Sequence, residues 1–563
     1  PGGVPKITIA GFGAYGLPGN YPSKPVNNNW DAALNGGFHN GIHYIKAGGQ
    51  VVHTRASGFD AGAFSPRGSF FFGSGANASA AAGGSSFNPA LNSLASFLTG
   101  SPASAGISSF QTTPTYRQTL TSGYITDTIN WRKNIHFELG MRYDVFSPLR
   151  TRFSNGAVAF DRGTNQVSTM TDNGNYDLNN FSPRVGVVIR PIERMAVRAA
   201  YAIQFFPQPF SLSAINQAAT AGQAGITGGF GTTAFALPSA AVPAGSSSTL
   251  NANQPFNVFA DTDPRTPYVH TYNLMVQGDL GNGVLLDIGY VGNGARQLPY
   301  SQALNYAQPG AGLAGLSFAN LNRTAALYSR GNGLTSSYNA LQVNLTKRFG
   351  AGLSLAGAYT YGKVLDNGFE QSNPFGRSNN RGPADFDRTH IFAMSHLWQL
   401  PFGPGSAFFR DGWASQLLGS WQLNGILRWS TGTPYSVFAD PLRCNCPGIS
   451  SVRADVGSGL GLNGQSSFDP ASFSSPAAGT LGSAGRNLFR GPDFFTYDVS
   501  VFRSFPVREN FNFELRAEAY NVTNTTNLAN PNGALWNLSA GTSTRIVNGG
   551  MGRQFQLGGR ILF

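Results

Sequence analysis

The chain has 563 residues and a formal net charge of +12, with 72 Gly, 33 Pro and 43 Phe. Aromatic residues make up 12% of the chain, which excludes intrinsic disorder, and the many Gly and Pro residues exclude a mainly helical protein. The basic residues are scattered along the chain and mostly arginine, whereas nucleic-acid binding requires a clustered basic face, so we expect no nucleic-acid partner.

Apolar and polar residues alternate with a period of two along most of the chain, which is typical of β-strands with one apolar face. The alternation is strictest in "IHFELGMRYDVF" (135–146) and "FNFELRAEAYN" (511–521). Runs of about 10 residues are long enough to cross a bilayer as tilted strands. In chain order we expect fifteen strands, at residues 28–36, 41–55, 113–130, 134–147, 182–190, 195–206, 268–280, 283–296, 336–348, 353–365, 386–400, 417–433, 491–505, 510–522 and 553–563.

The connections between these strands alternate between short and long. Short turns fall at "GFHN", "WRK", "PIER", "GN", "FGAG" and "PVRE", with a longer member around "PFGPGSAFFRDGWAS". The long loops cover about residues 56–112, 148–180, 207–267, 297–335, 366–385, 434–490 and 523–552. This pattern predicts an all-β, antiparallel transmembrane β-barrel with short periplasmic turns and long extracellular loops. The alternative, a soluble sandwich or propeller, gives no reason for every long loop to lie at one end.

No run reaches the roughly 18 consecutive apolar residues of a membrane helix. Trp131, Trp398 and Trp421 lie beside the expected short turns and Trp413 lies within one, which favours an interfacial girdle over ordinary packing. The arginine-rich surface predicts contact with outer-membrane lipid and lipopolysaccharide headgroups.

Several short motifs suggest chemistry that their context does not support. "GFGAYG" (11–16) matches a dinucleotide-binding fingerprint, but "LPGNYPSKPVNNN" cannot form the helix that must follow, so we expect a glycine turn. His39 and His43 lie in a Gly- and Asn-rich turn, and His390 and His396 are too far apart along a strand to share a metal. No nucleophile elbow, P-loop or zinc-protease motif occurs. We therefore expect no catalytic residue, no cofactor and no metal.

The two cysteines, Cys444 and Cys446, lie in a long loop and are too few for a disulfide framework or a structural zinc site. In an oxidising compartment they could form a disulfide that closes the loop tip, and free thiols are the alternative.

Polar residues on the presumed lumen face are the candidate ligand contacts. A hydrated, charge-neutralised wall explains the same residues. The candidates are His136, Glu138, Arg142, Asp144, Gln422, Asn424, Arg428, Glu514, Arg516 and Glu518.

Several blocks of the sequence together resemble the barrel of TonB-dependent receptors. They are "TPYVHTYNLMVQGDL" (266–280), "SSYNALQVNLTKRFGAGLSLAGAYTYGKVLDN" (336–367), "DFDRTHIFAMSHLWQLPFG" (385–403), "FSPRVGVVIRP" (181–191) and "FELRAEAYNVTNTTNLANPN" (513–532). The subgroup they resemble is the Oar-like receptors. The resemblance implies a 22-stranded outer-membrane barrel with an N-terminal plug, which imports a scarce ligand with energy relayed by the TonB complex. The terminal Phe563 resembles the aromatic residue that the barrel assembly machinery reads.

No plug or TonB-contacting segment matches within residues 1–563. An odd number of antiparallel strands leaves the two edge strands parallel, and an open edge cannot face hydrocarbon, where each unpaired backbone group costs several kcal/mol. The prediction is that the chain is the C-terminal portion of a larger barrel, roughly strands 8 to 22, with the signal peptide, plug and first strands outside it. The alternative is a complete 16-stranded passive porin in which "KITIAGFGA" pairs with residues 553–563.

The first functional hypothesis is a receptor that imports an oligosaccharide, a peptide or a metal chelate. A surface adhesion or assembly protein and the passive porin are the alternatives. The sequence does not identify the ligand.

Overall fold

The computed structural model describes residues 4–16, 23–60, 69–72, 89–100, 102, 104–110, 115–152, 157–170, 174–207, 220–227, 256–259, 265–323, 327–350, 352–368, 380–440, 444–449, 451–457, 467–508, 511–537, 539–547 and 551–563. Within these residues one sheet of 18 strands dominates the fold. Three of its members are short: β9 (Arg150–Thr151), β15 (Phe256–Phe259) and β20 (Gly382–Pro383).

The remaining strands of the sheet correspond one for one to the fifteen predicted from sequence. Each pairs antiparallel with the next in chain order. They are β3 (Ser23–Asn40), β4 (His43–Asp60), β7 (Thr115–Arg132), β8 (Ile135–Phe146), β12 (Phe181–Ile192), β13 (Met195–Phe205), β16 (Tyr268–Gly281), β17 (Val284–Ala303), β18 (Leu327–Gly350), β19 (Leu353–Asp366), β21 (His390–Gln399), β22 (Gln422–Ser430), β29 (Phe494–Arg508), β30 (Phe511–Tyr520) and β31 (Gln554–Leu562).

The strand register keeps the two faces of the sheet chemically distinct. Between β30 and β31, Phe513 lies opposite Ile561 and Ala517 opposite Leu557 on one side, while Glu514 lies opposite Arg560 on the other. Because successive side chains point to opposite sides of a strand, each pairing continues this separation into the next strand. We call the two sides the apolar face and the polar face.

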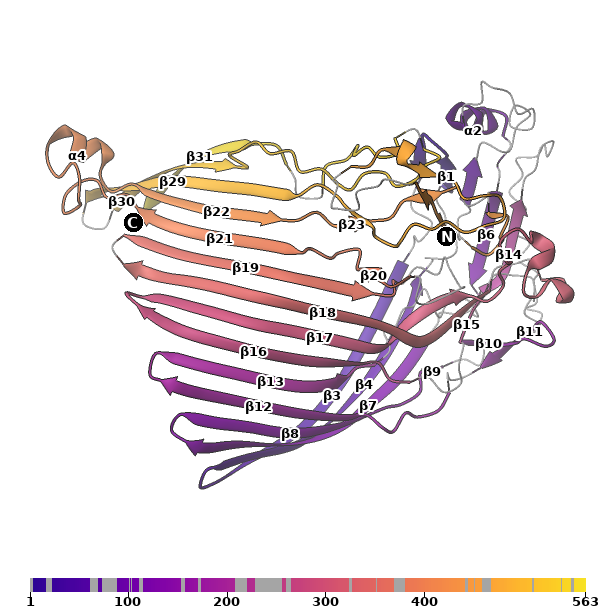
Figure 1. The fold of residues 1–563 in the computed structure, drawn as a ribbon, viewed down its shortest axis with the longest axis horizontal. Coiled ribbons are helices and arrows are strands. Elements are labelled where there is room, and N and C mark those ends of the chain that lie inside the picture. Colours follow the sequence, from indigo (N-terminus) through magenta and orange to yellow (C-terminus); the bar gives the residue numbers. More distant parts are fainter. Residues whose placement is uncertain are drawn as a thin grey trace.

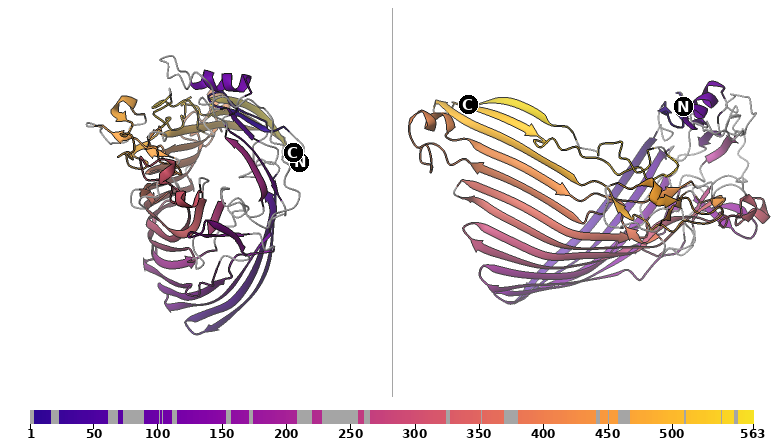
Figure 2. Two further views of the ribbon diagram at one scale, coloured as in Figure 1. Left: turned by 90° about the vertical axis from the view of Figure 1, so that its right-hand side faces the viewer. Right: turned by 45° about the horizontal axis from the view of Figure 1, so that its top comes forward.

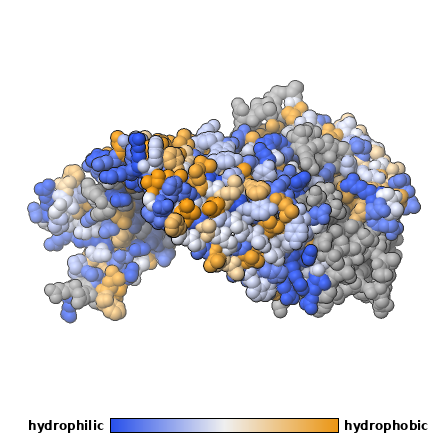
Figure 3. Space-filling view, turned by 90° about the horizontal axis from the view of Figure 1, so that it is seen from below, coloured by the Kyte–Doolittle hydropathy of each residue, from blue (hydrophilic) through white to orange (hydrophobic). Residues whose placement is uncertain are grey.

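Large hydrophobic side chains on the apolar face remain exposed in every part of the sheet. They include Leu34, Trp30, Leu139, Val185, Leu274, Ile288, Leu341, Leu515 and Leu557. Figure 3 views the molecule from below and shows apolar side chains gathered over its middle, with hydrophilic ones toward the two ends. A sheet that leaves one apolar face uncovered requires an apolar surrounding.

The sheet curves into a trough whose two ends differ (Figures 1 and 2). The C-terminus and the short helix α4 (Gly412–Leu418) lie at the end with the short turns, and the N-terminus and the long connections lie at the opposite end. We call these the turn end and the loop end. The alternation of short and long connections predicted from the sequence is therefore confirmed.

A second, smaller sheet lies at the loop end. Its strands are β1 (Lys6–Ile9), β2 (Gly13–Tyr15), β5 (Ser69–Phe72), β6 (Ser104–Phe110) and β14 (Thr220–Thr227). Ile9, Phe70 and Phe72 form its core, against which Phe97 of helix α2 (Pro89–Leu98) packs.

The small sheet bears on two predictions, the 16-stranded porin and the glycine turn at residues 11–16. β1 pairs with β2 and β5, and within the described residues β31 pairs only with β30, so the seam that the 16-stranded porin requires does not form. "GFGAYG" forms the tight turn and second strand of the β1–β2 hairpin, with Gly11 and Gly13 at positive φ, in agreement with the predicted glycine turn.

Some strand boundaries differ from those expected. Residues 417–418 belong to helix α4 and not to a strand, because "GWASQLL" contains good helix formers and follows a glycine-rich turn. "GFHN" lies within β3, and the hairpin turn is Gly41–Ile42. β17 and β18 extend well beyond their expected loop-end limits and pair with each other over much of that length.

The helices in the described part of the chain are all too short or too polar to span a membrane.

Candidate ligand-binding site

The structure places all of the predicted lumen residues on the polar face. His136, Glu138, Arg142 and Asp144 come from β8, Gln422, Asn424 and Arg428 from β22, and Glu514, Arg516 and Glu518 from β30. The register confirms that they share a face across the intervening strands. Their common face follows from the period of two in the sequence.

Two of the β8 residues, Arg142 and Asp144, form a hydrogen-bonded pair near the loop end of the strand. Arg142 donates from Nε to Asp144 Oδ1 and from Nη2 to Ser122 Oγ, both at 2.8 Å. Asp144 is only 3% exposed, and the amide of the buried Asn180 donates to its backbone carbonyl at 3.0 Å. His136 lies toward the turn end, with Nδ1 2.7 Å from Asn130 Oδ1. Arg142 and Asp144 therefore neutralise each other.

The β22 and β30 residues lie on either side of β29 and form continuous rows. One row runs from Gln422 through Phe502 to Arg516, and the next runs from Asn424 through Ser500 to Glu518. These two groups therefore lie about 10 Å apart, at two strand spacings.

Arg516 is the centre of the β30 group. Its guanidinium pairs with Glu514 at 3.1 Å and with Glu518 at 3.5 Å, and lies 5.2 Å from the ring centroid of Phe502. A cavity of about 200 Å³ beside it is lined by Glu514, Arg516, Gly558, Gly559 and Arg560. Since Arg516 and Arg560 balance the two carboxylates, this surface suits a hydrated polar ligand better than a strongly charged one.

The β8 group is not brought together with the other two groups. Seven long strands separate β8 from β22 in the sheet: β12, β13, β16, β17, β18, β19 and β21. The predicted residues are thus two polar patches on opposite parts of the trough wall.

Long loops form a folded layer at the loop end, which the sequence did not predict. We define the loop cap as the described parts of residues 304–323, 431–493 and 521–553. Its main hydrophobic core consists of Tyr435, Val437, Ala439, Ala454, Phe468, Phe473 and Phe489. Burial raises the pKa of the Tyr435 hydroxyl. A packed core of this kind holds the loops in one arrangement.

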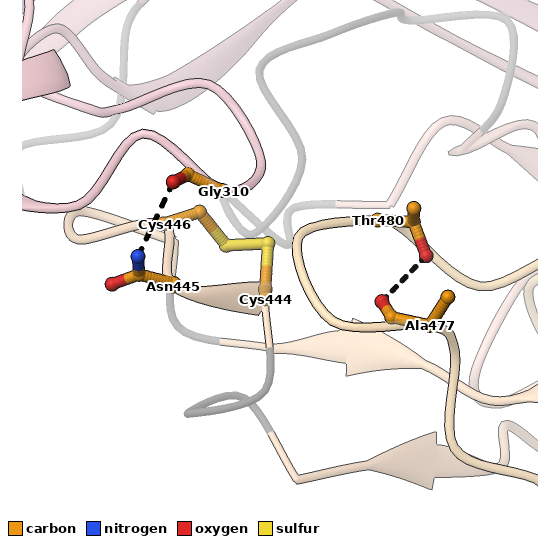
Figure 4. Close-up of a disulfide and its surroundings, with 6 residues drawn as sticks. All are labelled: Gly310, Cys444, Asn445, Cys446, Ala477 and Thr480. Carbon is orange, nitrogen blue, oxygen red and sulfur yellow. Dashed lines mark hydrogen bonds between the residues drawn. A yellow bond between two sulfur atoms is a disulfide. The ribbon is translucent and has the colours of Figure 1, made fainter.

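The turn at 444–449 joins two loops of the cap by hydrogen bonds (Figure 4). Cys444 and Cys446 are joined by a disulfide and are 1% and 4% exposed. The backbone amides of Gly310 and Gly312 donate to the carbonyls of Cys444 and Asn445, and the Asn445 amide donates back to the carbonyl of Gly310 at 3.3 Å. The disulfide-closed turn therefore contacts a different loop from its own.

Ion pairs, each with one buried member, attach the cap to the loop ends of β19 and β21. Arg486, whose side chain is 2% exposed, pairs with Asp366 and with Asp385, the latter at 2.9 Å. Arg490 pairs with Asp387, whose side chain is 1% exposed. The carboxylates Asp385 and Asp387 belong to the "DFDRTH" block that carried the family resemblance. The sequence therefore drew attention to this block but did not predict that its carboxylates pair with Arg486 and Arg490.

Two further arginines near the loop cap are partly or fully buried, and burial lowers the pKa of each guanidinium. Burial lowers the pKa of Arg323 to about 10, and its guanidinium lies 5.4 Å from the ring of Phe160 and donates to Asn165. Burial also lowers the pKa of Arg388, although the nearby Asp493 charge opposes the shift; Arg388 donates to Ser430 Oγ at 2.6 Å. Arg323 connects two loop segments, and Arg388 connects its loop to the end of β22.

The histidines have structural partners. His43 Nδ1 lies 2.7 Å from Asp127, His53 Nδ1 lies 2.9 Å from Thr119, and His396 Nε2 lies 2.9 Å from the hydroxyl of Tyr497. Among the described residues, no cluster of three or more His, Cys, Asp or Glu side chains could hold a metal ion.

The tryptophans predicted for a girdle lie at the turn end. Trp131 and Trp398 are 53% and 40% exposed, and Trp413 of α4 is 77% exposed. The Trp421 indole N–H donates to the carbonyl of Leu417 at 3.0 Å.

Comparisons with known proteins agree with this architecture. A family model described as "Outer membrane beta barrel domain" matches residues 1–556. No curated protein sequence matches. Among solved structures, the outer membrane transporter YddB from Escherichia coli is similar with a TM-score of 0.51 and 11% identity, over 96% of this chain and 54% of that chain.

Two receptors are also among the similar structures. The ferripyoverdine receptor of the outer membrane of Pseudomonas aeruginosa has a TM-score of 0.45 and 10% identity, over 95% of this chain and 48% of that one. The ferric preacinetobactin receptor BauA of Acinetobacter baumannii has a TM-score of 0.45 and 12% identity, over 96% and 55%. The chain therefore spans about half the length of the solved structures that it matches.

Proposed function

Because the chain belongs to the outer membrane β-barrel domain family, we propose that it is the barrel of a TonB-dependent receptor that imports a scarce ligand. Family membership makes it an integral outer-membrane protein. The observation that carries the proposal is the loop cap, whose packed core and cross-loop contacts form a preformed surface above a trough with a polar inner wall. A passive porin needs an open mouth, whereas a receptor needs a surface that captures its ligand first.

The ligand belongs to the class of large polar molecules. The polar face offers hydrogen-bonding side chains in balanced ion pairs, such as Arg142 with Asp144 and Arg516 with Glu514. Oligosaccharides, peptides and metal chelates all match such a wall. The Oar-like receptors, to which the sequence blocks are similar, remain our proposed subgroup.

The proposal also concerns strand number. β3 and β31 both run from the loop end to the turn end, and within the described residues each has one partner in the sheet, β4 and β30 respectively. Exposed backbone groups at a sheet edge cost several kcal/mol each in hydrocarbon. We therefore propose that further strands close the barrel, that this chain supplies roughly strands 8 to 22, and that a plug and a TonB-contacting segment belong to the same receptor.

The proposed partners follow from this assignment. They are the TonB complex, outer-membrane lipid and lipopolysaccharide, and the barrel assembly machinery, for which the fully exposed Phe563 after β31 is the proposed recognition residue.

A transport experiment tests the proposal. A strain lacking this gene should lose uptake of one compound from a panel of ferric chelates, oligosaccharides and peptides, and a strain lacking TonB should lose the same uptake. Uptake by the deletion strain complemented with the Arg516→Gln variant should be lower than uptake by the strain complemented with the Arg162→Gln variant. Arg162 lies in an exposed turn at the loop end and serves as the control. Unchanged uptake of every compound in both deletion strains would contradict the receptor assignment, and TonB-independent uptake would favour a porin.

A further inference from the structure

The hairpin between β21 and β22 is unlike the other turns at its end of the sheet. It covers residues 400–421 and includes α4, which projects beyond the strands in Figures 1 and 2. We call it the α4 hairpin. The other turns at this end, such as Gly41–Ile42, contain only a few residues.

The α4 hairpin has a defined internal structure. The Gly403 amide donates to the Phe408 carbonyl at 3.0 Å, the Ser415 hydroxyl donates to the Arg410 carbonyl at 3.1 Å, and Trp421 donates to Leu417. Gly403 and Gly419 approach so closely that a Cβ on Gly403 would lie 2.7 Å from the Gly419 Cα. The hairpin is thus a formed element whose outward side chains have fixed positions.

Its outward side chains are strongly apolar. Trp413 is 77% exposed, Leu417 61%, Phe408 59% and Phe409 51%. Four large, exposed apolar side chains on one short folded element mark a surface that another apolar phase covers.

The position of the hairpin indicates lipid as that phase. Arg503 of β29 points to the apolar face, where its guanidinium lies 4.6 Å from the ring of Phe505, and it donates to the carbonyl of Leu417 at 2.9 Å. The C-terminal end of α4 is therefore tied to the lipid-facing side of the sheet. Tryptophan and arginine together are typical of the membrane interface, where the apolar part of each side chain enters the acyl region.

The charges around the hairpin indicate an anionic headgroup. The ends of neighbouring strands contribute Arg348 of β18 on one side and Arg508 of β29 on the other, in addition to Arg410 and Arg503. The acidic residues in the α4 hairpin and at these strand ends are Asp411 and, in the sequence, Glu509. Four cations against two carboxylates favour phosphate-bearing lipids.

We propose that the α4 hairpin is a phospholipid-binding element that lies in the periplasmic leaflet. Phe408, Phe409, Trp413 and Leu417 insert into the acyl region, and Arg410 and Arg508 bind the phosphates of anionic phospholipids. The binding does not depend on which ligand the barrel carries or on whether it transports one.

The first arm of the test measures lipid retention. The full-length protein, purified from vesicles containing phosphatidylglycerol and phosphatidylcholine, is analysed by native mass spectrometry. The double variant Arg410→Gln with Arg508→Gln should retain about 25-fold less phosphatidylglycerol, because each basic residue near an anionic surface contributes roughly fivefold to binding. The amount of retained phosphatidylcholine should not change. The matched control, Arg162→Gln with Arg545→Gln, removes two exposed arginines at the loop end and should retain the wild-type amount.

The second arm measures how deeply Trp413 enters the bilayer. In vesicles with brominated acyl chains, Trp413→Phe should remove a quenched component of the tryptophan fluorescence, whereas Trp536→Phe, which changes a 56% exposed loop-end residue, should remove an unquenched one. An unquenched Trp413 would mean that water or a protein covers the hairpin and would overturn the proposal. A quenched Trp413 with unchanged phosphatidylglycerol retention in the arginine variant would overturn the anionic headgroup assignment. Circular dichroism confirms that each variant keeps its sheet.

Discussion

Arg486 joins the loop cap to the ends of two strands of the large sheet. Its side chain is 2% exposed and pairs with Asp366 and Asp385. Arg486→Met should loosen the cap locally, at a cost of about 2 kcal/mol, because it removes the charge-assisted hydrogen bonds to Asp366 and Asp385, whose side chains are 21% and 71% exposed and keep part of their hydration. Hydrogen exchange at the Asn487 and Gly491 amides measures the change.

Arg265→Met is the control for this prediction. Arg265 is 59% exposed and lies 4.0 Å from Asp177, and the 9% exposed Asp177 keeps the hydrogen bond that it accepts from the Thr266 amide, so we expect a loss of less than about 1 kcal/mol. Equal effects of the two substitutions would show that burial does not strengthen the Arg486 contacts.

The partners of Arg486 could not be predicted from sequence. Asp366 and Asp385 lie 120 and 101 residues away along the chain, and no local pattern reports such a pairing. The position of Glu514 and Arg516 on the polar face, in contrast, was predictable, because a strand fixes the direction of its side chains with a period of two residues. Sequence therefore determined the face of each candidate residue but not its neighbours.

Among the elements, the disulfide-closed turn at 444–449 has a specific mechanical role. Cys444 and Cys446 are two residues apart, so their disulfide closes a very small ring and its loop-entropy contribution is only about 1.5 kcal/mol. Cys444→Ser with Cys446→Ser should therefore loosen the contact with residues 307–312 without unfolding the sheet.

Hydrogen exchange of the Ala307, Gly310 and Gly312 amides, which donate to this turn, measures that loosening. Exchange in β17 and β18, on either side of the contacted loop, serves as the control and should not change. Faster exchange in those strands would mean that the turn supports the whole loop end and not one contact.

The same contrast, between patterns within one segment and contacts between distant segments, explains which elements could be predicted. The long strands follow from alternation within a single segment, and all of them are present. The small sheet was missed because β1 pairs in parallel with β5, more than sixty residues later, and β6 pairs with β14 beyond a further long segment. α4 was partly assigned to a strand because seven residues give too few turns for a helical period.

The whole molecule depends on the separation of its two faces, and adjacent residues of β16 test that separation. Leu274 is 51% exposed on the apolar face, and its neighbour Asn273 points to the polar face. In a bilayer, Leu274→Arg should destabilise the barrel by about 2–4 kcal/mol, because an arginine on the lipid side near the midplane loses its hydration. Asn273→Arg adds the same charge one residue away, where water and neighbouring polar groups solvate it, and should change stability little. Urea titration of the full-length barrel refolded into vesicles compares the two. Equal losses would mean that both faces meet the same surroundings, which is incompatible with a membrane barrel, whereas a selective loss for Leu274→Arg fixes which side of the trough faces lipid.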